Sequence, residues 1–177
     1  METTFVTHMD KPSFIICLNQ LIAEKLTLKE VGPVQDFAEL YFSILPLSEL
    51  EGLQWNDIFG NLYAWWRYIQ EYSYNGPKIN VLNPSLEEDG WLCGHTVVMA
   101  LMRDMPFLVD SLRMELNQRS ITIHRISSSV IHIVRDSKGK LVEVLPANHK
   151  QKNSKHKKIS KEALTYFEIN LHTSSQE

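Results

Sequence analysis

Cysteine and histidine are the residue types in this chain best suited to holding a metal ion or activating a nucleophile. The sequence contains two cysteines and seven histidines. Cys17 and Cys93 lie far apart and belong to no CxxC motif, which indicates neither a disulfide framework nor a zinc site. His124 and His132 share parity on one expected strand, but a straight strand would separate them by about 26 Å, too far for one metal ion. We therefore expect no metal site, and we interpret His95 as a strand-end histidine.

The sequence also lacks the motifs that bind nucleotide cofactors or carry a catalytic serine. Its seven glycines are scattered, so it has no glycine-rich phosphate loop and no nicotinamide-binding fingerprint. None of its serines lies in a nucleophile elbow. We expect neither catalytic nor cofactor-binding residues in this chain.

A lysine-rich run, HKQKNSKHKKISK over residues 149–161, carries six lysines and no acidic residue. Such a run could bind nucleic-acid phosphates by releasing counterions. It lacks the interleaved aromatic and arginine side chains that stack on and read bases. We interpret residues 147–162 as a flexible, solvated loop between two strands, with nucleic-acid binding as the second alternative function.

Length and composition indicate an ordinary globular protein. The chain has 177 residues, 44% of them hydrophobic, and a net charge of −3, which suggests neither nucleic acid nor membrane as a partner. No apolar run approaches the roughly 20 residues of a membrane span. The start is acidic, and the apolar FIICL that follows is too short for a signal peptide. We expect a cytoplasmic protein.

Apolar residues at helical spacing predict a helical N-terminal lobe over residues 1–76. Ser13 is expected to cap its first helix. A glycine–proline pair is expected to end that helix, and Pro33 to open the second. A third helix is expected to begin near Asn56. Its apolar stripe includes Trp65, and a stripe of this kind is typical of a core rather than of a cofactor site.

The pattern changes after the lobe. Residues 77–94 are rich in Gly, Pro and Asn and read as a connection with one short strand at 78–82. Residues 95–177 are expected to form an α/β domain with strands over 95–102, 121–134, 141–145 and 164–171 and a helix over 106–118. The serines of the second strand are expected to mark a bulge. The fold class is therefore α+β, with a β-α-β-β sheet and a helix on one face.

The segments DMPFLVDS, MELNQRSITIH and VRDSKGKLVEV carry a family resemblance. The first two, with the strand before them, look like an ACT-type domain, a ferredoxin-like module that binds small molecules. Residues 78–145 as a whole resemble the N-terminal region of the very large NAD-specific glutamate dehydrogenases of bacteria. The resemblance implies a non-catalytic regulatory or assembly module. It also implies that NAD binding and the oxidative deamination of L-glutamate to 2-oxoglutarate belong to regions beyond residue 177.

The resemblance places the candidate ligand loop at Arg103, Asp104, Met105, Pro106, Phe107 and Leu108. In ligand-binding ACT domains an acid–x–Pro–Gly–Leu turn presents its amides to an amino acid at the start of a helix. Phe107 stands where that turn has glycine, so we expect its ring to fill or cover the pocket. Replacing it by glycine would then cost about 3 kcal/mol or more. A structural or assembly role is favoured over the first alternative, a stand-alone amino-acid sensor.

The end of the chain suggests an incomplete ACT-like domain. An ACT-type unit has two helices on its sheet, and Ser174 and Glu177 have the capping-box spacing that begins a helix. We expect the second helix to follow residue 177 and the present sheet to be partly uncovered. The expected exposed residues are Phe167, Ile169 and Leu171, or Ile131 and Ile133. The expected partners are the rest of the same polypeptide, other copies of it and a small amino-acid effector.

Overall fold

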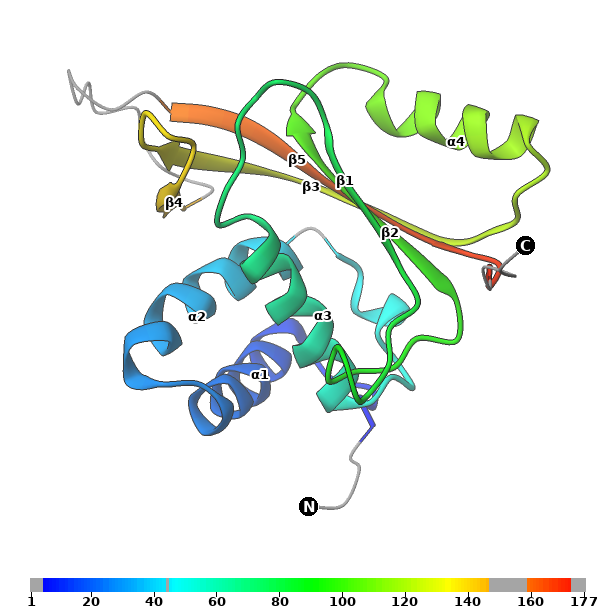
Figure 1. Ribbon diagram of the computed structural model, residues 1–177. Helices are drawn as coiled ribbons and strands as arrows, with labels where there is room; N and C mark the ends of the chain where they lie inside the picture. The colour runs from blue at the N-terminus through cyan, green and yellow to red at the C-terminus, as the bar shows by residue number, and fades with distance from the viewer. Residues whose placement is uncertain (1–4, 44, 147–158, 173–177) are drawn as a thin grey trace.

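The computed structural model describes residues 5–43, 45–146 and 159–172, which form four helices and a five-stranded sheet (Figure 1). The helical lobe contains α1 (Lys11–Lys25), α2 (Leu28–Ser43), a short 3-10 helix η1 (Leu47–Glu49) and α3 (Trp55–Tyr68). The strands are β1 (Lys78–Leu82), β2 (Thr96–Arg103), β3 (Ile123–Arg135), β4 (Leu141–Leu145) and β5 (Ile159–Ile169), and α4 (Leu108–Gln118) connects β2 to β3. The expected α+β class and the β-α-β-β order are confirmed.

The sheet has the strand order β1-β2-β5-β3-β4, and every neighbouring pair is antiparallel. β5, the last strand in the chain, therefore lies at the centre, between β2 and β3. Because both of these strands run antiparallel to β5, they run parallel to each other, and parallel strands require a crossover connection. The helix α4 supplies it, which gives the split β-α-β arrangement of ferredoxin-like folds.

The two faces of the sheet are covered by different helices, with α1–α3 on one face and α4 on the other (Figure 1). Side chains alternate between the faces of a strand, so every second residue of β2 and β5 faces the lobe. The lobe-facing members of the main core are Val97, Met99, Leu101, Ile131, Ile133, Leu164 and Tyr166. They join the buried residues of α1–α3 in one continuous hydrophobic cluster. Packing of the lobe on the sheet is therefore the main source of apolar burial.

The α4 face is less completely covered, because none of the α4 side chains is fully buried. We expected exposed apolar surface at Phe167, Ile169, Leu171, Ile131 and Ile133. All of these except Leu171 are buried, so that placement is wrong. The exposed apolar side chains on this face are Ile79 and Val81 of the edge strand β1, at 53% and 60%, and Val130 of β3, at 39%. The edge strand is exposed because α4 packs mainly against β3, on the other side of the central strand from β1.

Two helix starts differ from the sequence prediction. Asp10, not Ser13, caps α1, since its side chain accepts a hydrogen bond from the backbone N–H of Ser13 at 3.0 Å. Helix α2 begins before Pro33 and contains it. Glu30 Oε2 accepts a hydrogen bond from the Thr27 N–H at 3.4 Å, as in a capping box, and another from the Thr27 hydroxyl at 2.7 Å. This cap starts the helix at Leu28, so Pro33 lies inside it and leaves the Lys29 carbonyl without a helical N–H partner.

The bulge in β3 is not at its serines. Residues 127–129 pair regularly with β5, and the register shifts instead between Ile123 and Arg125, at His124. This irregularity also invalidates the prediction that His124 and His132 share one face of a regular strand.

Part of the chain lies outside the described residues. It includes most of the lysine-rich run, although Ile159–Lys161 belong to β5, and it includes the capping-box pair at residues 174 and 177. Among the helices of the described ranges, none has the length and apolar character needed to cross a membrane.

A buried ion pair between β3 and β5 also binds the end of the helical lobe. The Arg135 guanidinium donates to the two carboxylate oxygens of Glu162 at 2.8 and 2.7 Å, and these side chains are 2% and 0% exposed. Arg135 Nη1 also donates to the carbonyl oxygens of Ile69 and Gly139, at 2.9 and 3.0 Å. The Tyr74 hydroxyl donates to Glu162 Oε1 at 2.6 Å. Both charges therefore have the partners that a buried pair requires.

Replacing Glu162 by glutamine should lower the free energy of unfolding by about 3–5 kcal/mol, because Arg135 would remain buried without its counter-charge. Glu71→Gln is the matched control. Glu71 lies 3.7 Å from Lys140 in an ion pair whose side chains are 70% and 62% exposed, so we expect a loss of at most about 1 kcal/mol. Urea unfolding followed by circular dichroism measures both. Equal losses in the two variants would contradict this role for the buried pair.

Candidate functional site

A cavity of about 250 Å³ lies between the helical lobe and the sheet. Apolar side chains of the lobe line one side, among them Phe42, Leu50 and Ile58. The opposite side carries the polar residues Cys93, His95, Arg125, Tyr166 and Glu168. Such a cavity combines an apolar wall with a few convergent polar groups, as small-molecule sites do. We take it as the candidate functional site of the described part of the chain.

The carboxylate of Glu168 is the centre of the polar wall. Its Oε1 accepts hydrogen bonds from the Tyr166 hydroxyl at 2.9 Å and from Arg125 Nη1 at 3.3 Å. Its Oε2 lies 3.5 Å from His95 Nδ1. Burial raises the pKa of the Tyr166 hydroxyl, and the charge of Glu168 raises it further, so this hydroxyl keeps its proton and acts as a donor.

The sheet register explains why these side chains meet. Tyr166 and Glu168 are two residues apart on β5 and so face the lobe together. Arg125 is the β3 partner of Glu168. Because the bulge at His124 shifts the parity of β3, it turns Arg125 toward the same face as Glu168. The irregular residue in β3 is therefore what completes the polar wall.

The segment before β2 forms the rim of the cavity and is tied to α3. The backbone N–H of Leu92 donates to Asp57 Oδ1 at 2.9 Å. Trp91, which is 3% exposed, packs on Gly60 so closely that a Cβ at Gly60 would lie 2.4 Å from Trp91 Cβ. Burial raises the pKa of the neighbouring Cys93 thiol, and the charge of Glu168 adds to the effect. The rim therefore presents a neutral thiol close to a carboxylate.

The loop at residues 103–108 lies elsewhere. The Arg103 guanidinium stacks over the Tyr74 ring at 4.6 Å, and the Asp104 N–H donates to the carbonyl oxygen of Lys161 at 3.0 Å. His95 precedes β2 and Arg103 ends it, so about 26 Å of strand separates the cavity from this loop. The structure does not bring the two sites together.

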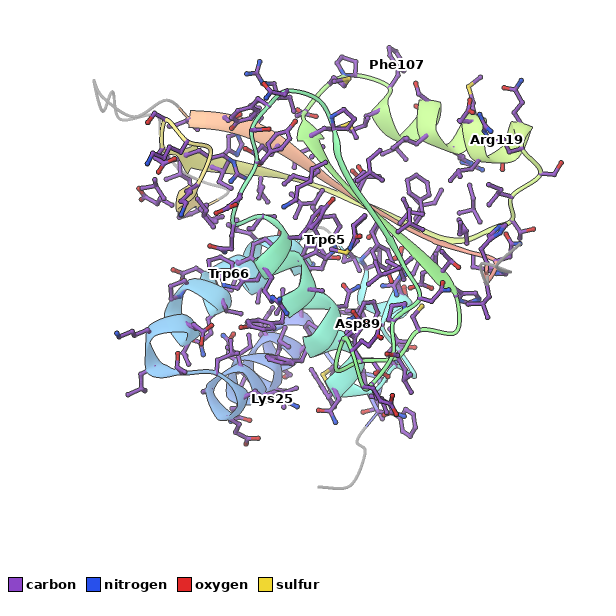
Figure 2. The ribbon with its side chains drawn as sticks, viewed as in Figure 1. Lys25, Trp65, Trp66, Asp89, Phe107 and Arg119 are labelled. Atoms are coloured by element: carbon purple, nitrogen blue, oxygen red, sulfur yellow. The ribbon has the colours of Figure 1, made fainter. Side chains whose placement is uncertain are left out.

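Phe107 does not fill a pocket, contrary to the sequence prediction. Its side chain is 77% exposed, and Figure 2 shows it at the start of α4, on the far side of the sheet from the lobe. Its φ of 61° lies in the left-handed region that favours glycine. The backbone thus has a glycine-type conformation at this position. A residue with a Cβ is strained in this conformation, and the exposed phenyl ring gains no burial that would offset the strain. Trp65, by contrast, is fully buried between α3 and the sheet (Figure 2).

Comparison with known proteins now decides the family. A family model for the glutamate dehydrogenase ACT1 domain matches residues 37–177. The chain belongs to this family. It is 39% identical, over 165 residues, to a protein of Pseudomonas aeruginosa named NAD-specific glutamate dehydrogenase, and that match covers 93% of this chain and 10% of the relative. A protein of Halomonas elongata with the same name is 34% identical over 160 residues, which are 90% of this chain and 10% of that relative.

The ACT1 chain therefore spans about a tenth of the length of these relatives. No solved structure matches it significantly. The expected family is confirmed. The matched region begins at residue 37, so it includes the part of the helical lobe that follows this residue.

The residues of the polar wall were missed by sequence reasoning. Cys93 and His95 were considered one at a time, and Arg125, Tyr166 and Glu168 were not singled out. Only the Cys–x–His spacing at residues 93–95 was a usable signal, since alternate residues of an extended segment point the same way. The contribution of β5 depends on strand pairing, which no local spacing in the sequence of an ACT1 domain reveals.

Phe107→Gly should leave the free energy of unfolding unchanged or raise it by up to about 1 kcal/mol, because it relieves a left-handed backbone and loses an exposed ring. Phe107→Ala is the control, since it removes the same ring but keeps the Cβ that causes the strain. Thermal unfolding compares the two. A glycine variant less stable than the alanine variant would contradict the strain argument.

Gly60→Ala should destabilise the ACT1 domain by about 1–3 kcal/mol, because the added methyl group collides with Trp91 and displaces the cavity rim. Gly32→Ala is the matched control. It also lies in a helix, but nothing is within 4 Å of the added Cβ, so we expect up to about 1 kcal/mol of stabilisation from helix propensity. Denaturant unfolding measures both changes, and effects of the same sign would refute the close packing at Gly60.

Proposed function

We propose that this chain is the non-catalytic N-terminal regulatory and assembly module of a large NAD-dependent glutamate dehydrogenase. The observation that carries the proposal is the coverage of the matches. Relatives named NAD-specific glutamate dehydrogenase match over at least 90% of this chain but only 10% of their own length. Oxidative deamination of L-glutamate to 2-oxoglutarate, with NAD as cofactor, is assigned to the regions of the enzyme outside this chain.

The side chains of this chain support a non-catalytic role for it. Its sequence has no glycine-rich dinucleotide-binding fingerprint. The polar wall of the cavity contains a thiol, an imidazole, a guanidinium and a carboxylate, but Glu168 already accepts hydrogen bonds from Tyr166 and Arg125. This arrangement suits binding or structural support better than hydride transfer.

The assembly role is supported by the exposed edge of the sheet. β1 is an edge strand, and its Ile79 and Val81 side chains present apolar surface on the α4 face. Edge strands and exposed apolar patches are places where other polypeptide segments dock. We assign this surface to contacts with the rest of the same polypeptide or with other copies of it, in a cytoplasmic enzyme.

The regulatory role is assigned to the loop of Arg103, Asp104, Met105, Pro106, Phe107 and Leu108, as the candidate site for a small amino-acid effector. Two observations support this choice. Phe107 adopts the left-handed conformation that glycine favours, at the start of α4. Arg103 and Asp104 also line a surface hollow together with Arg135 and Lys161.

The proposal predicts that this chain alone forms no NADH from glutamate and NAD. The complete enzyme carrying Ile79→Lys and Val81→Lys should keep its kcat but change its oligomeric state or its response to amino acids, since lysine disfavours apolar docking. Val142→Lys on β4 is the control, because this valine is 55% exposed on the opposite edge strand. Light scattering and steady-state kinetics provide the measurements. NADH formation by the chain alone would contradict the proposal. It would also be contradicted if the enzyme with both lysine substitutions had the same oligomeric state and the same response to amino acids as the control.

A further inference from the structure

We propose that Cys93, His95 and Glu168 bind a divalent metal ion of the zinc class at the rim of the cavity. One potential ligand atom from each residue lies within 4.8 Å of the other two. Thiolate, imidazole and carboxylate are the three ligand types that zinc takes from proteins. The inference does not depend on the proposed function of the parent enzyme.

The backbone brings the three side chains together before any metal is present. Cys93 and His95 are separated by one glycine in the segment that leads into β2, where the chain bends at Gly94 and His95. Glu168 pairs with Val97, which is two residues beyond His95. The carboxylate on the central strand is therefore a diagonal neighbour of the imidazole.

The spacing of two ligand atoms already suits a metal. In a tetrahedral zinc site with bonds of about 2.0–2.1 Å, neighbouring N and O ligands lie about 3.4 Å apart. His95 Nδ1 and Glu168 Oε2 are 3.5 Å apart. The Cys93 thiol, which is half-buried on the rim segment, lies within 4.8 Å of both atoms.

The two oxygens of Glu168 have separate environments. Oε1 accepts hydrogen bonds from Tyr166 and Arg125, whereas Oε2 faces His95. A carboxylate that binds a metal through one oxygen is commonly held by hydrogen bonds to the other. Tyr166 and Arg125 are thus positioned to orient the ligand without occupying the metal position.

Coordination to a divalent ion deprotonates a thiol, so Cys93 would bind as a thiolate. The Arg125 guanidinium is a fixed positive charge beside the site, and it lies 3.3 Å from Glu168 Oε1, not on the oxygen nearest His95. The His95 ring stacks on His124 with centroids 4.1 Å apart, which restricts the plane of the imidazole. Three protein ligands leave one tetrahedral position for a water molecule or a small molecule in the adjoining cavity.

Cobalt titration of the 177-residue chain, in buffer with a non-thiol reductant, tests the site. We expect a thiolate-to-cobalt charge-transfer absorption that zinc abolishes by competition. Cys93→Ser should remove the absorption, and Cys17→Ser, which changes the exposed cysteine on α1, should retain it. His95→Gln should weaken cobalt binding at least about tenfold, whereas His8→Gln, with a side chain that is 96% exposed, should not.

A second measurement needs no substitution. In the unchanged protein, zinc should slow alkylation of Cys93 by iodoacetamide at least about tenfold and leave the rate at Cys17 unchanged, as peptide mapping by mass spectrometry would show. This readout decides the question even if Cys93→Ser fails to fold. Equal rates at Cys93 with and without zinc, or a cobalt absorption that survives in folded Cys93→Ser, would overturn the metal site.

Discussion

A guanidinium and a carboxylate lie enclosed together where the helical lobe meets the sheet. Arg135 and Glu162 are almost completely buried, and two buried charges are tolerated only when their remaining hydrogen-bonding capacity is used. The carbonyl oxygens of Ile69 and Gly139 and the hydroxyl of Tyr74 use it. The end of the lobe, the β3–β4 turn and the two strands must therefore come together in one arrangement. Any other placement of the lobe would take the Ile69 carbonyl away from Arg135 and weaken the set of partners of this buried charge.

That arrangement also creates the cavity. At one end of the sheet the lobe is held by the hydrogen bond from Arg135 to the Ile69 carbonyl. At the other end it is held by the hydrogen bond from Leu92 to Asp57 and the packing of Trp91 on Gly60. Between these attachments, apolar helix residues face polar residues near the strand ends. The cavity is thus a product of the junction between lobe and sheet, and neither part forms it alone.

Sequence reasoning recovered the elements whose signal is periodic. Helical spacing located α1 and α3, and the β-branched runs located β2 and β3 and bounded β4 correctly. It failed where a local contact competed with the pattern. The Thr27–Glu30 cap extended α2 across Pro33, and the bulge at His124 altered the parity of β3. The polar wall was beyond reach because Glu168 approaches His95 only through long-range strand pairing.

The strand order has a consequence for how this protein is made. Ribosomes release β2, α4 and β3 before β5, yet β2 and β3 do not pair with each other and are joined only through β5. Until residue 169 has emerged, each of these strands presents an unpaired edge with a strongly apolar face. Closure of the sheet is therefore the last step in the folding of this domain and depends on contacts distant in sequence, and such contacts form slowly. During that interval the nascent chain is most exposed to mispairing with its neighbours, and most in need of a chaperone.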